Sequence, residues 1–490
     1  YVPYNTIKLT VLKLPVYKNI MVSDGGNMIT LNDRSKPMYF QIYMQLKEQI
    51  QSGKIKAGEK LLSKRKMAES LDVSVNTVEG AYSQLLSEGF IESVPKSGYY
   101  VCEIDKLNFV GKRKLLEQTI GSNKVKDSVK INFSTDGVDS VNFPYNTWRR
   151  LMKNCFNEYN PSILKSFPPE GSLELRKAVA SHIYRSRGVN CRAEQVIIGA
   201  GVDNLISMIS GLLGTDFLIA MEEPVYYEAY SYFKVLGHKM CSVPVDDSGI
   251  KTDCLPKDDN TAVYVTPSHQ FPLGITMPAG RRVRLLNWAY EKENRYIIED
   301  DYDSEFRYNS RPIPSVQSID GRGKVIYLGT FSKTIAPSVR ISYMVLPERL
   351  LEFYDEKYTK FSSAVSVLDQ NILTAFINEG HYERHLNRMR KLYGEKRAVL
   401  MEELKRLGEN ITINGENAGH HVAVKLLNGL SEEKMTEYAA KRGVKVYPLS
   451  KYFIKSVPEK YKSTVLLGYA ELSSEEISQG IKELKEAWRI

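Results

Sequence analysis

Cysteine is scarce in this chain of 490 residues, which contains only five. They are scattered, and no two have the C-x-x-C spacing of a zinc site or a redox pair. We therefore expect reduced thiols, with neither a disulfide framework nor a metal centre. These residues are Cys102, Cys155, Cys191, Cys241 and Cys254.

Long hydrophobic runs are also missing. A helix that crosses a bilayer needs about 20 apolar residues in succession, and no segment is long enough. Residues 1–27 contain scattered lysines but lack the layout of a signal peptide. We interpret them as an N-terminal extension whose native status the sequence leaves open, because Met21 and Met28 both suit a natural start. We expect a cytoplasmic protein without a membrane partner.

A strong charge imbalance is absent as well. The chain has 67 Lys and Arg against 58 Asp and Glu, a net charge of +9. This mild excess permits contact with nucleic acid without requiring it. Basic residues outnumber acidic ones in residues 103–130, which lack strong periodicity and are interpreted as a basic linker. The linker separates two predicted domains, at 28–102 and 131–490.

The first domain contains short helical patterns followed by a hairpin. Residues 41–53 have apolar positions at helical spacing, and residues 61–90 contain two further helices that Ser63 and Ser74 can cap. A tight turn at 72–74 joins those two helices, which is typical of a helix-turn-helix. Residues 91–101 predict two strands around a Pro-Lys-Ser-Gly turn. The inward side of the last helix is expected to hold Val78, Tyr82, Leu85 and Leu86.

This order of helices and hairpin resembles the winged helix of the GntR superfamily. The resemblance implies binding to double-stranded DNA, and the positions that match the DNA-facing ones of the family are Lys64, Arg65, Ser74, Asn76, Thr77 and Lys96. Two positions depart from the family pattern. Leu62 stands where a Pro is usual, and Val75 stands where an Arg is usual in the recognition helix, which removes a base or phosphate contact.

The second domain alternates apolar runs with helical stretches. Runs such as VIIGAG, FLIAMEEP, AVYVTP, YIIEDD and VIYLGT are hydrophobic on both faces. Strands of this kind, separated by helices, favour a mostly parallel sheet buried on both sides. The predicted fold class is therefore α/β.

One polar cluster follows the run that ends at Leu328. Lys333 lies among hydroxyl residues there, and Thr330 and Arg340 are nearby. A lone loop lysine is usually a solvated charge. A lysine can also be the amine that binds an aldehyde cofactor with a pyridine ring and a phosphate, if the chain supplies the other groups that such a cofactor needs.

Candidates for each of those groups occur in the second domain. Asp300 ends an apolar strand and can pair with a ring nitrogen, with the hydroxyl of Tyr302 directed to the ring oxygen. Gly201 and Val202 begin a helix after a strand, where backbone N–H groups suit a phosphate. Arg340 and Thr330 can add charge and a hydroxyl to the phosphate site, and Tyr226 can stack on the ring.

These elements, in this order, resemble the aspartate-aminotransferase-like, fold-type I proteins that use pyridoxal 5'-phosphate. With the winged helix in front, residues 28–490 resemble the MocR (GabR-like) subfamily of bacterial regulators. Further matching stretches are 142–148, 168–189, 266–282, 379–393 and 466–477. The resemblance implies an internal aldimine at Lys333, a homodimer and an operator with repeated half-sites.

The sequence leaves open whether the second domain is a catalyst. Aminotransferases of this fold usually hold the substrate carboxylate with an Arg near the last small strand, and residues 463–472 contain none. Lys451, Lys460 and Lys462 lie nearby, Glu228 can meet an amine instead, and Phe271 replaces an Asn that contacts the ring oxygen. The leading hypothesis is a DNA-binding regulator that senses an amino compound or pyridoxal phosphate. The alternatives are an active aminotransferase and a regulator with a vestigial cofactor site.

Overall fold

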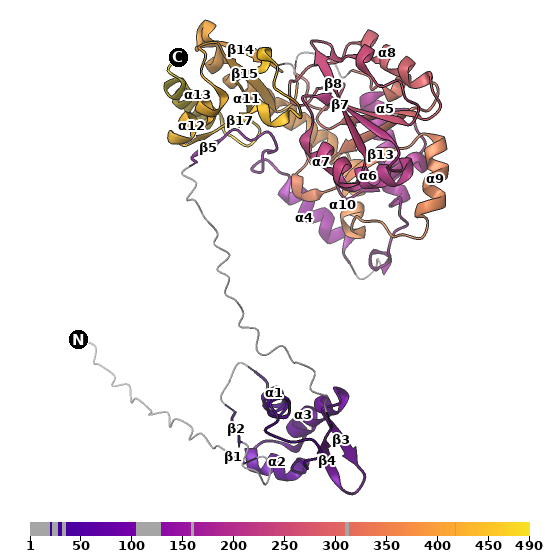
Figure 1. Ribbon diagram of the computed structural model, residues 1–490, viewed down its shortest axis with the longest axis vertical. Coiled ribbons are helices and arrows are strands. Elements are labelled where there is room, and N and C mark those ends of the chain that lie inside the picture. The colour runs from indigo at the N-terminus through magenta and orange to yellow at the C-terminus, as the bar shows by residue number, and fades with distance from the viewer. Residues whose placement is uncertain are drawn as a thin grey trace, which may run out of the picture. The chain divides into compact units, whose positions relative to one another are not determined.

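The computed structural model describes two compact units of the chain (Figure 1). They divide between Val125 and Lys126, within the segment interpreted as a linker. The described residues are 20–21, 28–31, 36–103, 129–157, 161–308, 313–416 and 418–490. Most of the predicted linker, and nearly all of residues 1–27, lie outside them. Among the described residues, no helix is long and apolar enough to cross a bilayer.

The smaller unit has three helices and a hairpin in the predicted order. Its elements are β1 (Ile20–Met21), β2 (Met28–Ile29), α1 (Met38–Gln51), α2 (Lys64–Leu71), α3 (Val75–Ser87), β3 (Ile91–Val94) and β4 (Gly98–Val101). The β1 strand belongs to the segment interpreted as an N-terminal extension, and it pairs with β2. Val78, Tyr82 and Leu85 are buried in the core of this unit, whereas Leu86 is only partly buried at its edge.

The predicted caps of the two helices are confirmed. Ser63 accepts a hydrogen bond from the Lys66 N–H at 3.3 Å, and Ser74 accepts one from the Thr77 N–H at 3.1 Å. Each bond satisfies an N–H group that has no partner within its helix. Asp72 adopts a left-handed conformation that ends α2 and turns the chain into α3. Lys96 lies at the exposed tip of the hairpin.

The larger unit is built on a sheet of eight strands in the order β6-β13-β12-β11-β10-β7-β8-β9. The pairings that involve β7, β8, β10, β11 and β12 with one another are parallel, and β9 and β13 pair antiparallel with their neighbours. The prediction of a mostly parallel sheet is confirmed. The strands are β6 (Val196–Gly199), β7 (Leu218–Glu223), β8 (Lys239–Asp246), β9 (Gly249–Ile250), β10 (Thr261–Val265), β11 (Arg295–Asp301), β12 (Val325–Thr330) and β13 (Ser342–Val345).

Both faces of this sheet are covered. On β12, Ile326 and Leu328 pack in one hydrophobic cluster, while Val325 and Tyr327 belong to clusters on the other side. Successive side chains of a strand point to opposite faces, so continuous apolar runs require two covered faces. The covering helices are α4 (Tyr145–Cys155), α5 (Leu173–Arg187), α6 (Val202–Leu213), α7 (Tyr227–Val235), α8 (Ala279–Tyr290), α9 (Glu348–Tyr358) and α10 (Val367–Asn378).

A second sheet lies toward the C-terminus, in the yellow part of the large unit in Figure 1. Its strand order is β14-β15-β18-β17, all antiparallel, and a short parallel pair joins β5 to β16. The strands are β5 (Ile131–Asn132), β14 (Ile411–Asn414), β15 (His421–Leu426), β16 (Val444–Lys445), β17 (Tyr447–Pro448) and β18 (Thr464–Gly468). The helices are α11 (His381–Lys405), α12 (Glu432–Lys441) and α13 (Ser474–Trp488).

Candidate functional site: a cavity around Lys333

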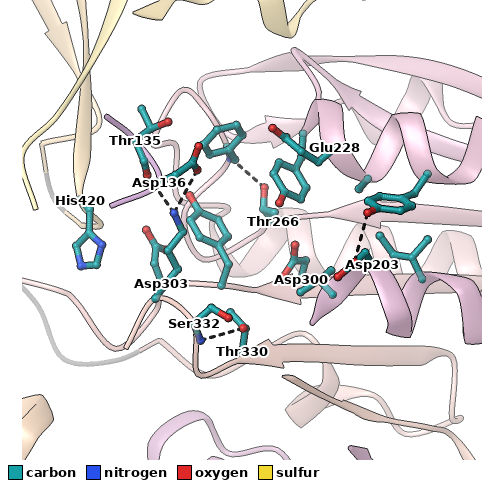
Figure 2. A pocket seen from close by; sticks show the side chains of 18 of the residues that line it. Thr135, Asp136, Asp203, Glu228, Thr266, Asp300, Asp303, Thr330, Ser332 and His420 are labelled. Carbon is teal, nitrogen blue, oxygen red and sulfur yellow. Dashed lines mark hydrogen bonds and ion pairs between the residues drawn. The ribbon is translucent and has the colours of Figure 1, made fainter. Parts of the chain in front are cut away.

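A cavity of about 290 Å³ opens beside the ends of β11 and β12. Ligands of α/β proteins commonly bind beyond the carboxyl ends of parallel strands, because the loops and helix N-termini meet there. Figure 2 shows its side chains, which come from segments far apart in the chain. The predicted residues that line it are Val202, Tyr226, Asp300, Tyr302, Thr330, Lys333 and Arg340, and Gly201 is next to Val202.

Lys333 directs its amine into this cavity from the turn after β12. The Nζ atom donates to the carbonyl oxygen of Thr135 at 3.1 Å and lies 3.4 Å from Oδ1 of Asp136. Figure 2 shows both contacts as dashed lines. The side chain is about one-fifth exposed, so an incoming molecule can reach the nitrogen. The lysine is therefore held by weak, exchangeable contacts near the mouth of the cavity.

Asp300 lies at the base of the cavity and is 3% exposed. The Tyr264 hydroxyl donates to its Oδ2 atom, while Oδ1 has no hydrogen-bond partner among the described residues. Burial raises the pKa of this carboxyl to about 7, although the Tyr264 hydrogen bond acts in the opposite direction. A buried carboxylate oxygen without a partner can accept from a protonated ring nitrogen.

The N-terminus of α6 forms a second polar corner of the cavity. Gly201 caps this helix with a φ of 92°, and an added Cβ would lie 2.5 Å from Nη2 of Arg340. That nitrogen also lies 2.5 Å from Oδ1 of Asp203. At the end of β12, the Thr330 side chain accepts a hydrogen bond from the Ser332 N–H at 3.1 Å. Backbone donors, a guanidinium and hydroxyls make this corner suited to a phosphate.

Aromatic side chains form the cavity wall. The rings of Tyr226 and Phe271 meet edge to face, with centroids 5.4 Å apart. Phe271 lines the cavity, which confirms that the segment around 271 faces the site. The Tyr302 hydroxyl donates to the carbonyl oxygen of His269 at 3.0 Å, so in this structure it is engaged by the protein itself. A planar ring placed between these side chains would be covered by apolar surface.

Several lining residues were not singled out from the sequence. Asp136 and His420 come from loops without a motif, and only their proximity to Lys333 in the fold reveals them, because the β5 segment and the C-terminal region reach the cavity through tertiary contacts. Other lining residues that were not singled out lie close in the chain to predicted ones, and they include Asp203, Ile206, Ala229, Tyr232, Thr266 and Asp303. Thr135 and His421 also line the cavity, and Ser332 belongs to the hydroxyl residues predicted around Lys333.

The predicted DNA-facing residues lie on the helices and hairpin of the smaller unit. Arg65, Asn76 and Lys96 are exposed. Ser74 and Thr77 are engaged with each other as the cap of α3, with their hydroxyl oxygens 2.8 Å apart. Lys64 forms an ion pair of 2.6 Å with Glu79 on α3, which the sequence did not predict. One of the predicted cations is thus partly neutralised by an acid on the same surface.

Comparison with known proteins identifies both units. Residues 130–484 match the family model "Aminotransferase class I and II", and residues 38–101 match "Bacterial regulatory proteins, gntR family". The chain thus combines a gntR-type DNA-binding domain with a domain of the aminotransferase class I and II fold. The aminotransferase-family match spans most of the chain.

Relatives with the same combination cover nearly the whole chain. The HTH-type transcriptional regulator YdeL of Bacillus subtilis is 42% identical over 93% of this chain and 97% of its own length. The probable rhizopine catabolism regulatory protein MocR of Rhizobium meliloti is 33% identical, covering 93% and 94%. A kynurenine aminotransferase of Pyrococcus horikoshii has a similar structure, with a TM-score of 0.67 and 26% identity over 74% of this chain and 91% of its own. The chain belongs to the MocR-type family of gntR regulators.

The cavity fits the cofactor of this aminotransferase family. The unpartnered oxygen of Asp300 suits the ring nitrogen, and the space above Gly201, which a Cβ would fill, suits the phosphate next to Arg340. Tyr226 would cover the ring, and Lys333 would supply the amine. The residues that would hold pyridoxal phosphate are therefore present as a set.

Proposed function

We propose that this protein is a transcriptional regulator that binds pyridoxal 5'-phosphate covalently at Lys333. Its affinity for DNA changes when an amino compound or the cofactor itself occupies the cavity. The observation that carries the proposal is the convergence of the Lys333 amine, the unpartnered Asp300 oxygen and the Gly201–Arg340 corner on one cavity. The gntR-type domain in the same chain would bind the DNA. Its place of action is the cytoplasm, on chromosomal DNA.

When bound, pyridoxal phosphate would supply an aldehyde that reacts reversibly with amines. Lys333 would hold the cofactor through Nζ, and an amino effector would compete with Lys333 for the same position and leave the lysine as a free amine. Thr135 and Asp136 would then offer the released Lys333 nitrogen the contacts seen in this structure. The protein thereby has two arrangements of Lys333 that differ by effector occupancy.

An effector can act on DNA binding only if it favours one arrangement of the protein over another. We propose that the regulator works as a homodimer, in which two winged-helix domains bind repeated half-sites. A shift in the relative position of the two large domains would change the spacing between the two winged-helix domains. The effector therefore needs differential affinity for the two dimer arrangements.

Efficient transamination is less well supported than sensing. The strand β18, where the carboxylate-binding Arg of aminotransferases is expected, is buried and apolar, and Leu466 packs there against Leu273. Lys451, Lys460 and Lys462 do not line the cavity. The cations that line the cavity are Lys333 and Arg340, and Arg340 is placed in the phosphate corner. Among the described residues that line the cavity, none is left to hold a substrate carboxylate by a bidentate bond.

The visible spectrum tests the proposed function. The protein purified with excess pyridoxal phosphate and then dialysed should keep one cofactor per chain and show an absorption band in the visible range. Reduction with borohydride should fix the cofactor on the peptide that contains Lys333. A colourless dialysed protein that still binds DNA would contradict cofactor sensing and favour a vestigial site. Rapid turnover of amino donors with keto acids would favour the aminotransferase alternative instead.

The Lys64–Glu79 ion pair leads to a prediction for DNA affinity. Glu79 places a negative charge on the recognition helix α3 and forms an ion pair of 2.6 Å with Lys64. Replacing Glu79 with Gln should free the lysine and remove a repulsion of phosphate, so nonspecific DNA binding should tighten severalfold and its salt dependence should steepen. Fluorescence anisotropy over a series of salt concentrations measures both. Glu92→Gln, on the strand β3 of the hairpin, is a control for the loss of one acid. An unchanged salt slope for Glu79→Gln would show that Lys64 does not reach the DNA.

A further inference from the structure

Carboxylates dominate the ionisable groups of the cavity. Five line it, and the two lining cations are Lys333 and Arg340. Three of the acids have side-chain partners within the protein. Asp203 contacts Arg340, Asp303 contacts Nδ1 of His269 at 2.8 Å, and Asp300 accepts a hydrogen bond from Tyr264. The remaining two are Asp136 and Glu228.

These two acids are exposed and lie near Lys333, with the Asp136 side chain 78% exposed. Asp136 lies 3.4 Å from Nζ of Lys333, and Glu228 makes no hydrogen bond or ion pair with another side chain among the described residues. Burial raises the pKa of Glu228, the nearby Asp136 raises it further, and Lys333 lowers it. The two carboxylates therefore interact with each other and with the same lysine. Figure 2 shows both among the side chains around the cavity.

Asp136 keeps a cationic partner when an effector is bound, and Glu228 does not. In the proposed function an amino effector would take the place of Lys333, and the released lysine would regain the contact with Asp136 seen in this structure. Glu228 has no side-chain partner among the described residues. A carboxylate on the effector would therefore meet like charge at Glu228, whereas a second amine would meet opposite charge.

Hydrogen-bond capacity of the cavity favours the same kind of ligand. His420 lines the cavity, is 3% exposed and has no partner for either ring nitrogen among the described residues. Burial and the nearby Lys333 lower its pKa, so the neutral ring keeps an acceptor nitrogen. Together with Glu228, it offers acceptors to N–H donors of a ligand. The aromatic rings of Tyr226 and Phe271 also suit a methylene chain and a cation.

We propose that the effector is an aliphatic diamine without a carboxylate, which places one amine at the cofactor in exchange for Lys333 and the other at Glu228. This inference rests on the proposed function, since it assigns the ligand class of the same cavity. Glu228 is the residue that selects the ligand. Asp136 would hold Lys333 once the lysine is released, as it does in this structure.

Matched pairs of ligands test the inference on the full-length, cofactor-loaded protein. 1,4-Diaminobutane is titrated against 4-aminobutyrate, and 1,5-diaminopentane against 5-aminopentanoate, with the shift of the visible band as the signal for binding. Within each pair only the far group differs. The diamine should shift the band at a concentration at least tenfold lower than the amino acid. Equal potency, or preference for the amino acid, would overturn the inference.

The variant Glu228→Gln provides a second test of the ligand class. It should bind diamines at least tenfold more weakly and lose most of the discrimination against the amino acid, because the charge that the second amine would meet is gone. Glu352→Gln on α9, an exposed acid that does not line the cavity, is the matched control and should behave as the parent. Unchanged discrimination in Glu228→Gln would also overturn the inference. A parent protein that shows no band before any ligand is added would contradict the proposed function itself, whereas a band without diamine preference contradicts only the ligand class.

Discussion

The variant Lys333→Ala is expected to lose covalent cofactor binding completely. Among the described residues, Lys333 is the only lysine that lines the cavity, so no other lysine described there can hold the cofactor. The phosphate corner and Asp300 remain in this variant, so pyridoxal phosphate should still bind, but reversibly. After dialysis the visible band should be absent, and borohydride should leave no cofactor on the chain. Absorption spectroscopy and mass spectrometry of the reduced protein measure both effects.

Lys441→Ala is the matched control for this loss. Lys441 is exposed on α12, where it pairs with Glu437, and it does not line the cavity. The control should retain the band at the level of the parent protein. Retention of the band in Lys333→Ala would show that another amine carries the cofactor. It would remove the basis for placing the effector exchange at the turn after β12.

The second large effect is expected for Gly468→Ala, at the end of β18. An added Cβ would lie 1.9 Å from the carbonyl oxygen of Ser134 and 2.9 Å from Cα of Thr135. The Gly468 N–H donates to the carbonyl of Phe133 at 3.0 Å, so the two backbones are held together at this point. Backbone atoms cannot rotate away as a side chain can. We expect the variant to lose about 3 kcal/mol of stability, near the upper end for overpacking.

This close contact also positions the cavity. The strained backbone would include Thr135, whose carbonyl oxygen accepts from Lys333. Scanning calorimetry should show a lower melting temperature for the large unit of Gly468→Ala. Gly280→Ala, in the first turn of α8, is the control, since its Cβ would meet no atom within 4 Å. A melting temperature equal to that of the parent would contradict the packing described for β18.

The sequence was sufficient for the elements that depend on local patterns. Ser63 and Ser74 predicted the helix starts because a capping hydroxyl acts within three residues, and the apolar runs predicted the parallel strands. The cavity residues at strand ends and helix starts, such as Asp300 and Gly201, could be predicted for the same reason. Asp300 lies near the end of β11 and Gly201 shortly after the end of β6, and both strand ends are visible in the sequence.

Contacts between distant segments could not be predicted in this way. Asp136 meets Lys333 across 197 positions of the chain, and the Lys64–Glu79 pair joins two helices. His420 carries no signal of its own, and its unpartnered nitrogens become apparent only when its neighbours are known. The Tyr302 hydroxyl was expected to face a ring oxygen and is bound to His269 here. Such contacts depend on register and loop paths that composition does not specify.

DNA affinity under changing cofactor occupancy tests the central claim most directly. A duplex obtained by in vitro selection with the full-length protein is titrated by fluorescence anisotropy, with pyridoxal phosphate alone and with 1,4-diaminobutane added. For the parent protein the account predicts at least an approximately fivefold difference in Kd between these two conditions, the lower end of usual allosteric coupling. Lys333→Ala should show no difference. Identical affinities for the parent protein in both conditions, despite a shifted visible band, would contradict coupling between the cavity and the DNA-binding domain.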